Sequence, residues 1–286
     1  MIALFKLLAR LPLPVLHGLG IALGWIVYWS PGRHSGRMRH NIESSGLCPT
    51  GHCGHLRARA IGESGKSLTE LMAVWLRPYA STLRLVKGSS GSEHFDAALS
   101  AGRGVILMSP HIGCFEIISL YVASRHPFTA MYKPPRKPLV ARLMRMGRER
   151  GQARLVPADL SGVRAQFAAL KRGEAIGILP DQVASLGDGV WAPFFGRPAY
   201  TPTLAANLQR KTRAAVLFVV AERLAWGRGY RLHFWPLPGD LPADKAEAAA
   251  SINREVEAIV RRFPEQYMWT YNRHKRPGGV TPPQAS

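Results

Sequence analysis

The fold is decided by residues 104–116, which read GVILMSPHIGCFE. The first five of these residues form an apolar run that predicts a strand buried within a sheet. Polar side chains follow where this strand ends. Because chemistry in open α/β sheets gathers at the carboxyl ends of strands, His111 and Glu116 are candidates for a catalytic base and its orienting partner. The stretch therefore predicts an enzyme with an α/β fold.

The helix expected after the strand restricts how these two side chains meet. Five helical positions turn a side chain by about 140°, so His111 and Glu116 cannot share one face of a regular helix. They meet only if His111 stays in the loop and Glu116 enters the first helical turn, with Gly113 letting the backbone pass close to both. The alternative, from the residues alone, is a surface histidine that caps a helix.

Further apolar runs outline the rest of the sheet. Strands are predicted at residues 128–132, 153–156, 175–179, 214–220 and 230–235. Helices are predicted at residues 94–101, 161–171 and 243–262, and helical spacing also runs from Leu56 to Leu76. This alternation predicts a layered α/β/α domain with a mixed central sheet.

The N-terminus predicts a membrane-anchoring helix within residues 1–32. Residues 11–32 contain no charged side chain and are long enough to cross a hydrocarbon core. Trp25, Tyr28 and Trp29 favour an interfacial belt over a signal-peptide cleavage site. Prolines and glycines weaken a straight spanning helix, so a helix that lies in the interface remains an alternative. Gly20 and Gly24 are spaced as in helices that dimerise in membranes.

The chain is strongly basic. Its 38 Lys and Arg residues against 18 Asp and Glu residues give a formal charge of +20, which predicts an anionic partner: nucleic acid, a membrane surface or an acidic substrate. Tyr132, Lys133, Arg136 and Lys137 follow a strand end, where they fit phosphates or an acidic carrier protein. No nucleic-acid-binding motif is recognisable, so no nucleic acid partner is expected.

Three local patterns have simple interpretations. Residues 62–67 (GESGKS) resemble a P-loop, but Ala60 replaces the first glycine that the motif requires, so a continuous helix is expected. The cysteines and histidines of residues 48–55 fit no standard zinc spacing and predict a polar loop. Cys114 is expected to be buried rather than a covalent nucleophile. Three cysteines are too few for a disulfide scaffold and favour a reducing compartment.

Residues 104–116 resemble the HxxxxD/E signature of the glycerolipid and lysophospholipid acyltransferase superfamily. More narrowly, they resemble the late acyltransferases of lipid A biosynthesis, the lauroyl and myristoyl transferases of Gram-negative bacteria. Four further segments agree with that family in their order along the chain: YKPP at 132–135, GRER at 147–150, LPDQ at 179–182 and PEQYMW at 264–269. Together with the anchor, the resemblance covers nearly the whole chain.

The resemblance implies a role for four residues. His111 would be the general base that takes a proton from an acceptor hydroxyl, and Glu116 would orient it. Arg148 matches a family arginine that binds an acceptor phosphate or the developing oxyanion, with Arg145 and Arg150 as neighbouring alternatives. Asp181 matches a family aspartate assigned to substrate binding. No metal and no cofactor are expected, because a thioester donor supplies the driving force.

The resemblance also implies the reaction and its setting. A fatty acyl chain would pass from acyl carrier protein to a hydroxyl of a phosphorylated glycolipid, a lipid A precursor. The expected location is the bacterial inner membrane, with an acyltransferase domain over residues 33–276 facing the cytoplasm and a disordered tail at 277–286. The alternatives are an acyl-CoA-dependent acyltransferase acting on another glycolipid or a lysophospholipid, and a noncatalytic basic protein that binds membranes or nucleic acid.

Overall fold

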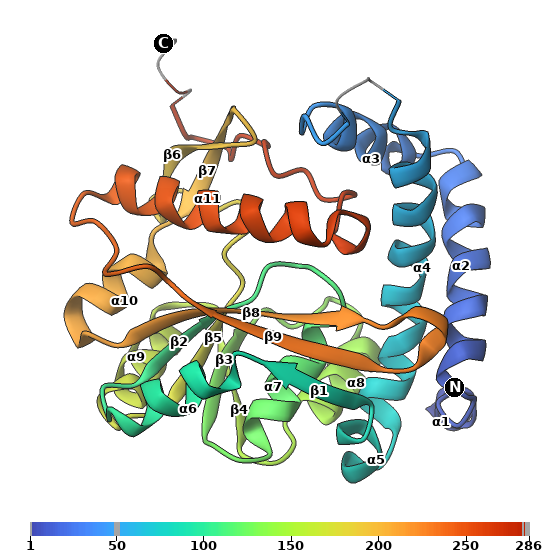
Figure 1. Cartoon of the computed structure of the whole chain (residues 1–286), viewed down its shortest axis with the longest axis horizontal. Coiled ribbons are helices and arrows are strands. Elements are labelled where there is room, and N and C mark those ends of the chain that lie inside the picture. The colour runs from blue at the N-terminus through green and yellow to red at the C-terminus, as the bar shows by residue number, and fades with distance from the viewer. Residues whose placement is uncertain (1, 49–51, 282, 284–286) are drawn as a thin grey trace.

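A mixed sheet forms the centre of the molecule (Figure 1). The computed structural model describes residues 2–48, 52–281 and 283. Within them, seven strands pair in the order β1-β9-β8-β2-β5-β3-β4, and a separate two-stranded sheet pairs β6 with β7. Strand β9 is antiparallel to β8, whereas β8, β2, β5, β3 and β4 are parallel neighbours. The predicted mixed α/β sheet is confirmed.

The predicted strands lie close to their observed positions. The strands are β1 (Val86–Ser90), β2 (Val105–Met108), β3 (Phe128–Tyr132), β4 (Ala153–Pro157), β5 (Ala175–Ile178), β6 (Gly189–Phe194), β7 (Arg197–Pro202), β8 (Ala215–Arg223) and β9 (Tyr230–Pro236). Sequence patterns missed β1, which has an exposed polar sequence, and the β6–β7 hairpin. Strand β8 also continues to Arg223, three residues past its predicted end.

Helices cover both faces of the sheet. The helices are α1 (Ile2–Leu8), α2 (Leu13–Trp29), α3 (Arg33–Glu43), α4 (Gly54–Leu76), α5 (Tyr79–Leu83), α6 (Ser92–Ser100), α7 (Phe115–Ala123), α8 (Pro138–Arg148), α9 (Leu160–Lys171), α10 (Leu204–Thr212) and α11 (Lys245–Arg262). The P-loop-like residues 62–67 lie inside α4, as expected for a continuous helix.

Alternating side chains of the central strands enter two apolar clusters. From β2, Ile106 and Met108 pack on the side that includes residues of α9, α10 and α11. Val105 and Leu107 pack on the opposite side, which includes residues of α6 and α7. All four side chains are almost fully buried, because a central parallel strand is covered on both faces. The sheet therefore holds the end of β2 rigidly.

Helix α2 lies alongside α4 at one end of the sheet (Figure 1). Small residues allow this close approach: a Cβ atom on Gly20 would lie 2.6 Å from Thr69 Oγ1, and one on Gly24 would overlap the Ile61 carbonyl. On α4, a Cβ on Gly65 would overlap the Gly20 carbonyl. The Gly20–Gly24 pair, whose spacing is also that of helices that dimerise in membranes, thus packs against α4 of the same chain.

Replacing Gly65 with alanine is expected to destabilise the fold by about 1–3 kcal/mol, because the added methyl group forces α2 away from α4. Urea unfolding monitored by circular dichroism measures this change. Gly36→Ala is the matched control: Gly36 lies in α3 and a Cβ there meets no atom within 4 Å, so its stability stays equal or rises by about 0.5–1 kcal/mol. Equal stability of the Gly65 variant and wild type would contradict this packing.

A membrane-crossing helix is not evident in the described residues. No single helix among them is long and apolar enough to span a membrane, although α2 and α3 together meet the length and composition, with a bend of 98° between them. The anchor over residues 1–32 therefore stays a prediction. Of the tail at 277–286, positions 282 and 284–286 lie outside the described residues, and the Thr281 carbonyl accepts a hydrogen bond from Trp191 Nε1 at 2.8 Å.

The cysteines differ from the sequence-based expectation. Cys48 and Cys53 form a disulfide bond between α3 and α4, with their Cα atoms 5.5 Å apart. The expectation of a reduced polar loop is therefore wrong for this pair. This Cα–Cα distance lies within the ordinary range for a disulfide bond. Cys114 is the free cysteine and is buried.

Candidate active site

His111 lies three residues beyond the end of β2. The neighbouring parallel strand is β5, and Met108 is directly opposite Ile178 in their register. Asp181 lies three residues beyond Ile178, so the two chains leave the sheet side by side and bring His111 and Asp181 together. The Ser109 N–H extends the pairing by donating to the Ile178 carbonyl at 2.9 Å. Both side chains are buried at this edge of the sheet.

Asp181 holds His111 through two hydrogen bonds. Its Oδ2 accepts from the His111 backbone N–H at 2.9 Å, and its Oδ1 lies 2.8 Å from His111 Nδ1. Burial by itself would raise the pKa of the Asp181 carboxyl, but the nearby His111 charge and hydrogen bonds lower it below its ordinary value. An ionised carboxylate only accepts hydrogen bonds, so the hydrogen of a neutral His111 ring sits on Nδ1. Its Nε2 then carries the lone pair of a base.

Gln182 covers the other ring nitrogen. Its Nε2 lies 3.0 Å from His111 Nε2 and donates to it when Nδ1 carries the ring hydrogen. The Phe115 ring packs edge-on against the imidazole at 4.8 Å between centroids. These contacts fix the plane of the ring from three sides, as a base needs if it is to meet a substrate proton in one geometry.

Glu116 contacts other groups than His111. It lies in the first turn of α7, while His111 stays in the loop before it, as the sequence predicts. Arg148 Nε donates to Glu116 Oε2 at 2.7 Å and its Nη2 donates to Oε1, and Trp75 Nε1 donates to Oε2 at 3.1 Å. The expected pairing of Glu116 with His111 is therefore corrected: Asp181 occupies Nδ1, and a guanidinium and an indole bind the Glu116 carboxylate.

Arg148 and Glu116 form a largely buried ion pair at the end of α8. Burial alone would lower the pKa of the Arg148 guanidinium, but the charge of Glu116 outweighs burial and raises it. Only two of the five guanidinium N–H groups point at Glu116, and 20% of the Arg148 side chain remains exposed. The guanidinium therefore stays charged and keeps N–H groups that Glu116 does not bind.

The C-terminal segment fixes the loop between His111 and α7. The Met268 N–H donates to the His111 carbonyl at 3.0 Å, and the Gly113 N–H donates to the Gln266 carbonyl at 3.1 Å. Gly113 has a φ of +60°, and a Cβ at this position would overlap the Ala221 carbonyl. Only glycine fits this approach to β8. The segment 264–269, which marked the family resemblance, thus supports the loop directly.

Cys114 is not placed as a nucleophile. Its side chain is almost fully buried, and burial raises the pKa of the thiol well above its ordinary value. A thiol is nucleophilic as its thiolate, which this environment disfavours. The structure thus agrees with the sequence-based interpretation of Cys114 as a small buried side chain.

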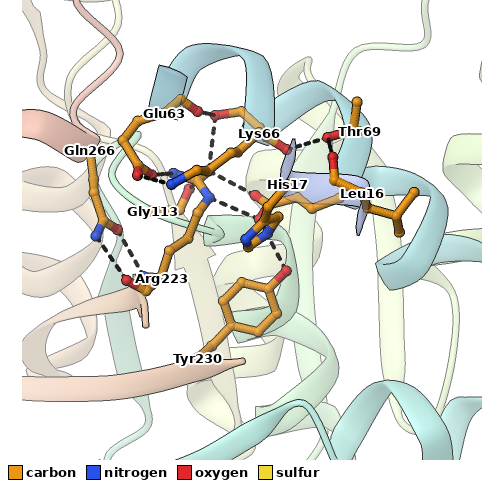
Figure 2. A network of polar contacts seen from close by, with 11 residues as sticks. Leu16, His17, Glu63, Lys66, Thr69, Gly113, Arg223, Tyr230 and Gln266 are labelled. Carbon is orange, nitrogen blue, oxygen red and sulfur yellow. Dashed lines mark hydrogen bonds and ion pairs between the residues drawn. The ribbon is translucent and has the colours of Figure 1, made fainter. Parts of the chain in front are cut away.

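A buried ionic network lies behind the loop (Figure 2). Arg223, at the end of β8, forms a two-pronged ion pair with Glu70 of α4, at 2.8 Å from Nε to Oε2 and 2.7 Å from Nη2 to Oε1. The Tyr230 hydroxyl donates to Glu70 Oε2 at 3.0 Å. Burial would raise the pKa of the Glu70 carboxyl, but Arg223 and His17 lower it from 4.5 to about 2.

This pKa shift predicts an acid-labile contribution to stability. Ionised Glu70 stabilises the fold fully above pH 4.5, and the contribution, about 3 kcal/mol for this shift, is lost as the pH falls from 4.5 towards 2. Unfolding free energies at pH 6 and pH 3 measure it: the loss on acidification should be smaller in Glu70→Gln than in wild type. If Glu70→Gln does not fold, the double variant Arg223→Met/Glu70→Met serves instead. An equal acid loss in variant and wild type would contradict the assignment.

Comparison with known proteins decides the family. A family model described as bacterial lipid A biosynthesis acyltransferase matches residues 1–276. The chain belongs to this family. It is 31% identical to the lipid A biosynthesis palmitoleoyltransferase of Escherichia coli (strain K12), over 94% of this chain and 88% of the relative. It is 29% identical to the lauroyltransferase of the same organism, over 98% of this chain and 92% of the relative.

The chain is also similar to an acyltransferase whose name refers to a different glycolipid. A phosphatidylinositol mannoside acyltransferase of Mycobacterium tuberculosis is 29% identical over 51% of this chain and 46% of the relative. Membership of the lipid A acyltransferase family makes this chain an O-acyltransferase with an acyl donor and a glycolipid acceptor. Its four predicted site residues form two pairs, His111 with Asp181 and Glu116 with Arg148.

Proposed function

We propose that this acyltransferase moves a fatty acyl chain from acyl carrier protein to a hydroxyl of a phosphorylated lipid A precursor, with His111 as general base. The observation that carries this proposal is the His111–Asp181 pair, with 2.8 Å between Nδ1 and Oδ1 at the carboxyl edge of the sheet. This contact directs the lone pair of a neutral ring to Nε2, the nitrogen that would receive the substrate proton.

The proposed step needs only groups of this chain and its two substrates. The acceptor hydroxyl replaces the Gln182 amide at His111 Nε2 and gives up its proton there as its oxygen attacks the thioester carbonyl. The C–S bond then breaks, and the protonated ring gives the proton to the leaving thiolate. Asp181 stabilises the positive ring between these transfers, because its carboxylate is ionised and in contact with Nδ1.

Glu116 and Arg148 have a different role in this proposal. Glu116 holds the Arg148 guanidinium in place, and the remaining N–H groups of that guanidinium bind an acceptor phosphate or the oxyanion formed at the thioester carbonyl. The guanidinium can bind Glu116 and a substrate anion at the same time, because only two of its five N–H groups are directed at Glu116. In this proposal Arg148 stabilises negative charge on the substrates, whereas His111 transfers the proton.

The surface of α2 supports attachment to a membrane, which we propose to be the bacterial inner membrane. Its outward side chains are apolar and exposed, among them Leu19, Ile26 and Trp29, with Trp29 73% exposed. Arg33 and Arg37 follow directly on α3, where they would meet anionic headgroups. We place α2 in or partly through the bilayer interface, with the carboxyl edge of the sheet in reach of a glycolipid.

A donor comparison tests this function. Purified protein is incubated with a phosphorylated disaccharide lipid A precursor and either acyl carrier protein or coenzyme A carrying the same acyl chain, and the acceptor is analysed by mass spectrometry. The expected result is one added acyl ester with the carrier protein as donor and a rate at least tenfold lower with coenzyme A. Faster transfer from coenzyme A, or no acylated acceptor from either donor, would contradict the proposal.

A further inference from the structure

The Gly113 carbonyl is the point where the loop between His111 and Glu116 meets a buried charge. Arg223 Nη2 donates to this carbonyl at 2.7 Å. On the other side of the same peptide, the Cys114 N–H donates to the Ala221 carbonyl at 2.9 Å. The side-chain amide of Gln266 holds the backbone of Arg223, because it forms hydrogen bonds with both the N–H and the carbonyl of that residue. The middle of the loop is therefore fastened to the end of β8.

The Arg223 guanidinium is itself held by α4. Its side chain is only 2% exposed, and Glu70 and Glu63 supply the carboxylates, with Nη1 of Arg223 3.1 Å from Glu63 Oε2. Ser67 Oγ accepts a further hydrogen bond from Nη2 at 2.9 Å. Figure 2 shows Glu63 of α4 and Gly113 of the loop on either side of the Arg223 guanidinium. A guanidinium with this many partners has a single position.

Helix α2 contacts Glu70 and the helix that carries it, α4. His17 Nε2 lies 3.4 Å from Glu70 Oε2, and the Thr69 hydroxyl donates to the Leu16 carbonyl at 2.7 Å (Figure 2). One continuous chain of contacts thus runs from α2 through α4 and Arg223 to the loop between His111 and Glu116. The groups outside the loop take no part in the proposed proton transfer.

We propose that Arg223, held by Glu70, is a positioning residue that sets the His111–Glu116 loop through the Gly113 carbonyl. The proposal rests on the proposed function of His111 and extends it to a residue over 100 positions away in sequence. Gly113 stands two residues after His111 and three before Glu116, so a shift of its peptide moves the base and the Arg148-binding carboxylate together. Displacement of reacting groups by about 1 Å lowers a rate by about a hundredfold.

The test separates positioning from folding with the double variant Arg223→Met/Glu70→Met. Replacing a buried ion pair with apolar side chains of similar volume largely preserves stability, yet it removes the bond to Gly113. The expected kcat for acyl transfer falls about ten- to a hundredfold, with KM for the acyl donor within twofold of wild type. Arg223→Lys keeps the positive charge but loses the two-pronged geometry of the guanidinium, and it should give a smaller fall in kcat. This variant replaces the double variant if the double variant does not fold.

A second readout follows the loop without activity. Cys114 is buried in the loop and is the free cysteine. Because Glu70 and Arg223 also act on the pKa of its thiol, alkylation is measured on the peptide by mass spectrometry across a range of pH, which separates thiol ionisation from local opening. Alkylation should be several-fold faster in the double variant than in wild type at matched unfolding free energy. The matched control is Arg77→Met: Arg77 bonds the Ala9 and Leu11 carbonyls and does not touch the loop, so kcat and Cys114 alkylation stay at wild-type values.

A kcat within twofold of wild type, or unchanged Cys114 alkylation, in the double variant would overturn the positioning role. Failure of the proposed function gives a different result. Wild-type protein would then transfer no acyl chain at all, while Cys114 alkylation would still decide whether Arg223 holds the loop.

Discussion

His111→Ala is expected to lower kcat for acyl transfer about a thousandfold, because the acceptor hydroxyl loses the base that removes its proton. The effect should fall on kcat more than on KM, since the ring is buried and contacts Asp181 and Gln182 in the absence of substrate. Single-turnover assays with preloaded acyl carrier protein measure it. Membrane association should stay unchanged, whereas the free energy of unfolding should fall, because Asp181 is left buried without its partner.

His94→Ala is the control for this variant. His94 is exposed on α6, which leads into the amino end of β2, opposite the end that carries His111. Its replacement should leave kcat within twofold of wild type. A His111→Ala protein that retains a tenth or more of wild-type kcat would exclude His111 as the base, whatever the structure of the loop.

Asp181→Asn is expected to lower kcat about a hundredfold. An amide in this position is uncharged, so it stabilises the protonated ring less, and it can donate to Nδ1 and leave the lone pair on the wrong nitrogen. Asp244→Asn is the control: Asp244 caps α11 through the Ala246 and Glu247 N–H groups, and asparagine caps equally well, so activity and stability should be unchanged.

A comparison of Asp181→Asn with Glu116→Gln decides which carboxylate orients the His111 ring. Nitrogen NMR of 15N-histidine-labelled protein should show His111 with its hydrogen on Nδ1 in wild type and in Glu116→Gln. The tautomer distribution should change in Asp181→Asn. A ring that responds to Glu116→Gln and not to Asp181→Asn would restore Glu116 as the orienting partner and contradict the hydrogen bonds described here.

The sequence was sufficient to predict the frame of the site. Buried strands are recognisable in the sequence as apolar runs. The polar residues after β2 indicated that His111 lies at the carboxyl edge of the sheet. The prediction that His111 precedes α7 and Glu116 enters its first turn was also correct. Glycines and prolines between the runs marked where the chain reverses, so most strand bounds agree with the structure to within three residues.

The pairing of the site residues depended on information absent from local patterns. His111 and Asp181 meet because β2 and β5 are neighbours, although β3, β4 and three helices separate them in the chain. A usable signal was present, since each residue stands three positions after a fully apolar strand end, but strand order was needed to use it. Closeness in sequence favoured Glu116 instead.

Trp75 and Arg223 show a second reason for what sequence reasoning missed. Trp75 fits the apolar pattern of α4, and its role depends on the indole N–H that reaches Glu116. Arg223 was hidden because a basic residue in a chain with a charge of +20 is expected at the surface, whereas here three elements bury it. A buried charge is recognised only when the partners that neutralise it are known.

The most direct test of the account is the mass of the acceptor after incubation of the purified protein with acyl carrier protein loaded with a fatty acid and a phosphorylated lipid A precursor. Wild-type protein should add one acyl chain as an ester, and His111→Ala protein, folded and at equal concentration, should leave the precursor unchanged over the same time. Equal acylation by the two proteins, or no acylation by wild type, would contradict the central claim that His111 activates a glycolipid hydroxyl for acyl transfer.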